Sequence, residues 1–328
     1  MPRRSTERVM SLPDCPRPSA SRLRGAEGGA LMAFTSMACV QLGLALSVHV
    51  FDQLGPLGVA GLRLVWAGIL LLILVRPRPR DFSSRDLRAC CTLGVVTAGL
   101  MLFFMMAIAR IPLGTASALE FLGPLTVSIY GPGSGRKRWT LIAATGVVLL
   151  TQPWHGGIDP VGLAFAIGAG ACWGTYILLT QHVGDRVTGL SGLAVSMPVA
   201  GAFAVIVVLL VDGRSELDRV TWHVLLIMLA LAALHPVLTF SLEYLSLRAL
   251  TAKAFGTLMS LEPAIAILAG LLVLGQTPNV SSAFGVIFVV IAGIGAIRTG
   301  AREPAQQDHY VDMYSLPAVP ESDRRSPT

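Results

Sequence analysis

The sequence predicts an all-α polytopic membrane protein whose ten transmembrane helices form two inverted-topology five-helix repeats. Of its 328 residues, 53% are hydrophobic and only 13% are charged, and the mean hydropathy is +0.67. A soluble single-core domain does not normally have this composition. Two further observations support the prediction: apolar stretches of spanning length follow one another along the chain, and a glutamate motif occurs in both halves.

Each predicted helix is an apolar stretch, interrupted by few charges, of about the length that crosses a bilayer. The ten stretches are 30–50, 56–75, 89–109, 112–130, 139–153, 160–180, 190–211, 222–246, 254–273 and 280–297. The stretch 139–153 is the shortest and needs its flanking residues to reach across the membrane.

The distribution of basic residues predicts the orientation. With both termini in the cytoplasm, 21 of the 25 Lys and Arg residues lie on the inner side, three lie on the outer side and Arg63 lies inside the second helix. Basic loops resist translocation, so this bias predicts that both termini are cytoplasmic. The same bias accounts for the net charge of +6 without a nucleic-acid partner.

The chain divides into two tails and two repeats. Residues 1–28 and 299–328 are rich in Pro, Arg, Ser and Glu and are expected to be disordered cytoplasmic tails. The two five-helix repeats are expected at 29–153 and 154–298.

The repeats are indicated by motifs that recur along the chain. Gly-Thr-x-x-x-Leu-Glu with a nearby proline occurs at 114–124 and again at 256–263, and Ala38-Cys39 matches Ala171-Cys172 at an offset of 133 residues. Because five is odd, the second copy must enter the membrane from the opposite side. This arrangement is typical of secondary transporters.

The motif places two carboxylates, Glu120 and Glu262, near the bilayer midplane, where an ionisable side chain suggests a functional site. Proline lacks the N–H that continues a helix, so Pro124 and Pro263 are predicted to break the helices beside these carboxylates. The combination could hold a cation, an ammonium group or a proton. The alternative is that each glutamate bonds a neighbouring helix and each proline is a packing kink.

Three other ionisable residues lie inside predicted helices. Arg63 could anchor a substrate carboxylate, neutralise Glu120 or form a structural pair. Glu243 lies near the cytoplasmic end of its helix, within reach of water. His235 is central and could handle protons, although a satisfied interior histidine is the favoured interpretation.

The helix at 160–180 carries small residues and two aromatic candidates. The run Gly168–Gly174 favours close helix contact. Trp173 and Tyr176 either line a cavity or pack against a neighbouring helix.

No cofactor, metal site or enzyme active site is predicted. The five cysteines have no metal-ligand spacing and are interpreted as structural. The glycine-rich segment 131–137 lacks the Gly-Lys-Ser/Thr ending of a phosphate loop, and no convincing nucleophile and base cluster occurs among the helices.

The sequence also carries runs that resemble one transporter family. These runs are 118–125, 168–173 with 176–178, 240–243 and, with the highest specificity, 255–264. They are similar to those of the threonine/homoserine exporters in the EamA-type drug/metabolite transporter superfamily. Thr239 and Thr251 stand where the family pattern has proline.

The resemblance implies a ten-helix inner-membrane exporter of small amino acids such as threonine and homoserine, driven by proton exchange. Its partners would be the amino acid, protons and the lipid bilayer. The oligomeric state stays open, a homodimer included. Alternatives are export of another metabolite or a drug and, more remotely, a membrane sensor that does not transport.

Overall fold

The computed structural model describes residues 20–78, 80, 82–130, 136–152, 159–184, 186–187, 190–213, 220–239, 242, 246 and 258–299. Every regular element within these residues is helical. The tails before residue 20 and after residue 299, Glu243, and Gly256 and Thr257 of the second motif lie outside the described residues.

The described helices form ten segments, as the sequence predicts. Eight segments are each described by one helix: α1 (Ala20–Val48), α2 (Phe51–Val75), α3 (Ser84–Ile108), α6 (Arg136–Thr151), α7 (Pro160–Gly184), α8 (Ser191–Val211), α13 (Glu262–Leu274) and α14 (Val280–Thr299). Within α2 the backbone of Gly55 is not helical and marks a kink. In the fourth segment α4 (Leu113–Glu120) is followed by α5 (Leu122–Tyr130), and in the eighth α10 (Trp222–Ala232) runs into the π-helical turn η3 (Ala233–Leu238).

The outer surface of the bundle is apolar, which is the reverse of a soluble protein. Five of the helices are long and apolar enough to cross a membrane. Large aliphatic side chains are exposed around the bundle: Leu210 is 80% exposed and Leu272 is 81% exposed. Exposed aliphatic side chains of this kind are suited to contact with lipid.

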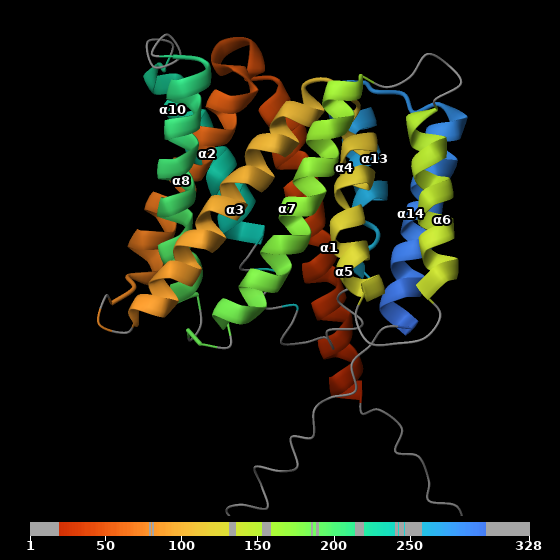
Figure 1. Ribbon diagram of the computed structural model, residues 1–328, viewed down its shortest axis with the longest axis horizontal. Helices are drawn as coiled ribbons and strands as arrows, with labels where there is room; N and C mark the ends of the chain where they lie inside the picture. Colours follow the sequence, from red (N-terminus) through yellow and green to blue (C-terminus); the bar gives the residue numbers. More distant parts are fainter. Residues whose placement is uncertain are drawn as a thin grey trace, which may run out of the picture.

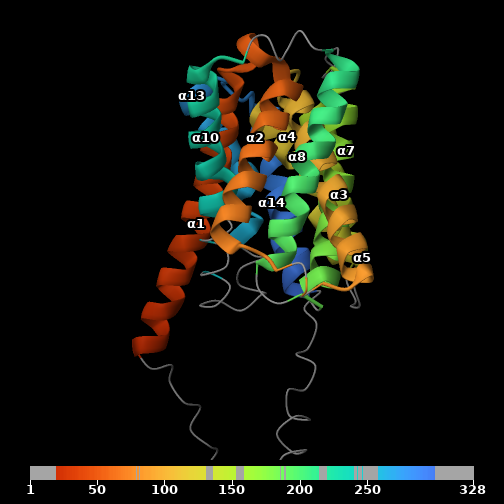
Figure 2. The ribbon, with the colours of Figure 1, turned by 90° about the vertical axis from the view of Figure 1, so that its left-hand side faces the viewer.

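The first helix is longer than its apolar stretch. It begins at Ala20, within the region expected to be a tail, and extends past the ends of the neighbouring helices (Figures 1 and 2). A helix propagates readily once its core turns are formed, so polar residues beyond the apolar stretch can continue it.

The contacts between segments are related in pairs across the two halves. In the two halves α1 corresponds to α7, α2 to α8, α3 to the α10–η3 segment and α4 to α13. The contact of α1 with α13 therefore corresponds to that of α7 with α4. The contacts of α3 with α7 and α8 correspond to those of the α10–η3 segment with α1 and α2. Three other large contacts, α2 with α8, α4 with α13 and α6 with α14, each join a segment to its own counterpart. The packing of the described helices therefore follows an approximate twofold relation between the halves, and α6 and α14 stand together at one end of the bundle (Figure 1).

Glycines allow the central helices to approach closely. A Cβ atom at Gly68 of α2 would lie 2.9 Å from the Cα of Pro198 in α8, and one at Gly201 of α8 would lie 3.0 Å from the Cα of Val65. The backbones of α2 and α8 thus meet directly, the usual mode of association between helices in a membrane.

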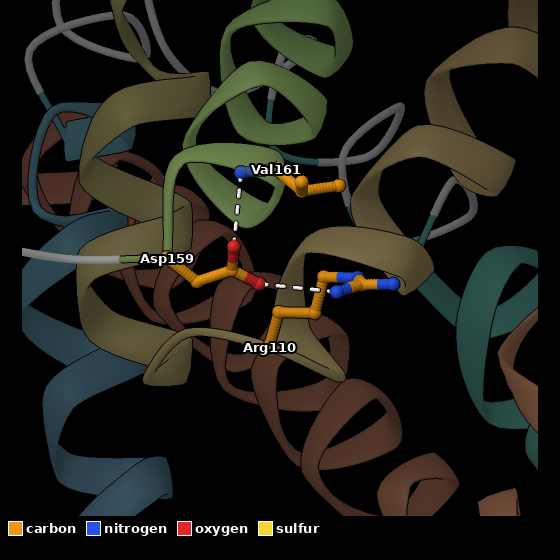
Figure 3. A network of polar contacts seen from close by, with 3 residues as sticks. All are labelled: Arg110, Asp159 and Val161. Carbon is orange, nitrogen blue, oxygen red and sulfur yellow. Dashed lines mark hydrogen bonds and ion pairs between the residues drawn. The ribbon is translucent and has the colours of Figure 1, made fainter.

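At one end of the bundle, an ion pair links α3 to the start of α7 (Figure 3). Asp159 Oδ1 accepts a hydrogen bond from the backbone N–H of Val161, and its Oδ2 accepts one of 3.2 Å from Arg110 Nη1. The bond from Val161, followed by the bond from Arg110 and its charge, holds the pKa of Asp159 below its ordinary value. Asp159 thereby caps the N-terminus of α7 and fixes its position against α3.

Candidate functional site

The fourth segment is interrupted directly after Glu120. α4 ends at Glu120 and α5 begins at Leu122, with Phe121 between them. Pro124 lies in the first turn of α5 and has no N–H to offer to the carbonyl of Glu120. That carbonyl instead faces α7, where a Cβ atom at Gly170 would lie 2.8 Å from its oxygen.

The ninth segment has its interruption directly before Glu262. A turn in which Leu261 N donates to Leu258 O precedes α13, and α13 begins at Glu262 with Pro263 in its first turn. Proline is well tolerated there because the first N–H groups of a helix have no intrahelical partner. The carboxylate of Glu262 lies at the positive end of the helix dipole, which favours a negative charge.

Both glutamates line one cavity of about 180 Å³ inside the bundle. A space of this size has room for on the order of ten water molecules, which is comparable with the roughly eight non-hydrogen atoms of a small amino acid. The cavity is lined by Val40, Leu44, Leu64, Thr97, Leu100, Met101, Phe104, Glu120, Trp173, Tyr176, Met197, His235, Pro236, Met259 and Glu262.

The two carboxylates are both buried in the wall of this cavity. Glu120 is 9% exposed and Glu262 is 6% exposed. Gln41 of α1 donates a hydrogen bond of 3.2 Å from its Nε2 to Glu262 Oε1. Like charges repel strongly in a low-dielectric site, so a proton or an ammonium group placed between them would lower the energy of the pair.

Arg63 lies behind the cavity wall. Its side chain is 1% exposed and is not among the lining residues. Nη1 donates to Ser47 Oγ at 3.0 Å, and Nη2 contacts His235 Nδ1 at 2.6 Å and donates to the carbonyl of His235 at 3.3 Å. Within the described part of the chain no carboxylate lies within ion-pair distance of Arg63.

The two aromatic candidates of α7 both line the cavity. Trp173 packs edge-on against Phe121 in the break of the fourth segment, with ring centroids 6.1 Å apart. Tyr176 lies one turn further along α7. Glu243, the remaining candidate, lies outside the described residues.

Sequence reasoning missed Gln41, and it did not identify the partner of His235. A glutamine within an apolar stretch is a signal of its own, because its amide needs a partner at that depth. His235 was recognisable as central, but its contact with Arg63 joins residues 172 positions apart and no local pattern indicates it.

Comparison with known proteins agrees with this architecture. The model of the EamA-like transporter family matches residues 27–151 and again residues 160–298. A protein named threonine/homoserine exporter RhtA from Salmonella typhimurium (strain SL1344) is 32% identical over 282 residues, covering 84% of this chain and 92% of the relative. The protein of the same name from Escherichia coli (strain K12) is 32% identical over 281 residues, covering 83% and 92%.

A solved crystal structure with 17% sequence identity has the same fold, with a TM-score of 0.56 over 83% of this chain and 96% of the other. The two matches of the family model together span most of the chain, and the matching relatives are named as transporters. The chain is therefore a multi-pass membrane protein that belongs to the EamA-like transporter family.

Proposed function

We propose that this protein is a secondary transporter that exports small amino acids such as threonine and homoserine across the cytoplasmic membrane in exchange for protons. The observation that carries the proposal is the cavity that Glu120 and Glu262 both line, each at a helix break. The relatives named as threonine/homoserine exporters cover most of the chain and supply the substrate class.

The proposed roles follow from charge. The pair formed by Glu120 and Glu262 binds the substrate ammonium group in one state and a proton in the other, since either cation relieves the repulsion between the carboxylates. Trp173 and Tyr176 form the wall of the same cavity and contact the body of the substrate. The breaks near Pro124 and Pro263 place the carboxylates at helix ends rather than in the middle of regular helices.

Alternating access would use the two halves of the chain. Their helix contacts occur in equivalent pairs, which supports two repeats related by a twofold axis. With five segments in each half, that axis would lie in the membrane plane. The excess of Lys and Arg on one side supports cytoplasmic termini.

The experiment uses purified protein in liposomes loaded with labelled threonine, with and without a pH gradient. Glu120→Gln and Glu262→Gln keep the shape of the side chain and remove its charge. The matched control is Glu27→Gln, a change at an exposed position near the start of α1. Both cavity variants should lose efflux driven by the pH gradient, whereas the control should retain it.

Exchange of labelled for unlabelled threonine without a gradient separates the two proposed roles. A variant that still exchanges threonine but no longer responds to pH has lost the proton site. A variant that loses both has lost the ammonium site. Wild-type efflux and pH response in both cavity variants would disprove the carboxylate mechanism.

A second candidate function is export of a less polar metabolite or drug. The observation in its favour is the number of apolar side chains in the cavity wall, among them Met101, Phe104 and Met197. Competition of apolar amines against labelled threonine distinguishes the two: stronger competition by the amines than by homoserine would favour this alternative.

A further inference from the structure

We propose that His235 binds the carboxylate of the substrate through its Nε2–H group, and that Arg63 positions His235 for this role. The inference rests on the proposed function and deepens it, because it assigns a binding partner to the carboxylate of the amino acid, which the two glutamates cannot bind.

The hydrogen bond between Arg63 and His235 fixes the proton on the imidazole. A guanidinium group can only donate, so His235 Nδ1, 2.6 Å from Arg63 Nη2, must be the acceptor. A neutral imidazole that accepts at Nδ1 carries its proton at Nε2. His235 is therefore held as a donor whose N–H points away from Arg63.

The backbone reinforces this arrangement. His235 has φ −143° and ψ 116°, an extended conformation inside η3 that removes its carbonyl from the helical hydrogen-bond pattern. Arg63 Nη2 donates to that carbonyl at 3.3 Å. Nη1 of the same guanidinium donates to Ser47 Oγ, and the Ser47 hydroxyl donates to Gly43 O at 2.6 Å. One guanidinium thus holds both the ring and the backbone of His235 against α1 and α2.

The charges around the cavity indicate that the Nε2–H donor of His235 binds the substrate carboxylate. Glu120 and Glu262 line the same cavity as His235 and would repel the negative end of a zwitterion. The positive charge of Arg63 lies directly behind the imidazole, and no described carboxylate is within ion-pair distance of it. This cation polarises the ring and strengthens the Nε2–H group as a donor to an anion.

Other donors in the wall are less suited to this role. The hydroxyl of Thr97 donates to Leu93 O at 2.7 Å within its own helix. Trp173 and Tyr176 also line the cavity, but the guanidinium of Arg63 contacts Ser47 and His235. The amino acid is accordingly oriented with its ammonium group toward the glutamates and its carboxylate toward η3.

The test compares threonine with 1-aminopropan-2-ol, which is threonine without its carboxylate. Both compete with labelled threonine for purified wild-type protein and for two substitutions of His235. In His235→Asn the side-chain oxygen can still accept from Arg63, but the amide is too short to reach the position of Nε2. In His235→Gln the amide nitrogen reaches that position. Met228→Leu, a volume-conserving change at a buried position of α10 that is not among the cavity-lining residues, is the control.

The expected readout is the ratio of the two affinities. His235→Asn should weaken threonine binding by about tenfold or more, as expected for loss of one hydrogen bond to a charged group, and leave the amine almost unaffected. His235→Gln should restore most of the preference for threonine, and Met228→Leu should not change it. Arg63→Met should lower the ratio as His235→Asn does, because the ring loses its fixed donor orientation.

An equal loss of threonine and amine binding in His235→Asn would show general damage to the cavity and would overturn the inference. An unchanged ratio in that variant would overturn it as well. If wild-type protein bound neither threonine nor homoserine, the proposed function would fail and this assignment would fail with it.

Discussion

The contact between α4 and α7 predicts that one methyl group at Gly170 will disturb transport. A Cβ atom there would lie 2.8 Å from the carbonyl oxygen of Glu120 and 3.3 Å from its Cα, whereas 3.4 Å or more is an ordinary contact. In Gly170→Ala the two helices must separate by about 0.5 Å, because interiors are close-packed and the obstacle is backbone. Glu120 would move with α4.

The effect on stability should be small and the effect on transport large. Overpacking lowers the free energy of unfolding by about 1 to 3 kcal/mol. Replacing glycine with alanine inside a helix raises it by up to about 1 kcal/mol. Binding sites tolerate displacements of only about 0.5 Å, so the rate of threonine exchange should fall by about tenfold. The measurements are labelled-threonine exchange in liposomes and the thermal unfolding of the purified variant.

Gly168→Ala is the matched control, on the same helix and with the same change in helix propensity. The atoms nearest to its Cβ atom would belong to the ring of Phe103, the first at 3.2 Å, and an aromatic side chain can shift where a backbone carbonyl cannot. We expect transport in this variant to remain near the wild-type rate. Equal rates for Gly170→Ala and Gly168→Ala would refute the argument that backbone contact with Glu120 sets the geometry of the site.

Two further predictions concern the ends of the bundle. The folded-state pKa of Asp159 is lowered, so its stabilising effect is present at neutral pH and is lost as the pH falls through the folded-state pKa. Asp159→Asn should therefore lower the unfolding temperature at pH 7 and have no effect in strong acid. A difference in unfolding temperature that persists in acid would contradict this. Single cysteines at Arg80 and Gly213, in the loops after α2 and α8, should react with a membrane-impermeant reagent from opposite sides, the first from the cytoplasm; reaction of both from one side would contradict the topology.

The number of helices and the two helix breaks could be predicted because residue types carry that information locally. Ten apolar stretches give ten segments, and a Glu close to a Pro inside such a stretch marks an interruption. The end of α4 at Glu120 and the start of α13 at Glu262 lie where these residues place them. The start of α1 at Ala20 was less predictable, since helix propagation into polar sequence has no strong local signal.

The partners of the ionisable residues could not be predicted, because they depend on contacts between distant segments. Arg63 could be interpreted from the sequence as a direct ligand of the substrate, but its guanidinium donors contact Ser47 and His235 behind the wall. Gln41 meets Glu262 across 221 positions. Only the packing of α1 against α13 and of η3 against α2 creates these pairs.

The asymmetry between the two halves has a physical consequence for selectivity. The paired glutamates occupy equivalent places in the fourth and ninth segments, so by themselves they present the same charge from both halves. The interruption at His235 in the eighth segment has no equivalent in the third, where α3 is continuous from Ser84 to Ile108.

A zwitterion needs opposite environments for its two ends. Under the proposed assignment, the two glutamates bind the ammonium group. The interruption at His235, which has no equivalent in the other half and has Arg63 behind it, forms the end of the site for the carboxylate. Under the same assignment, discrimination between amino acids and simple amines would depend on η3 and its contacts more than on the glutamates, because a small amine would satisfy the glutamates but would leave His235 without a carboxylate to bind.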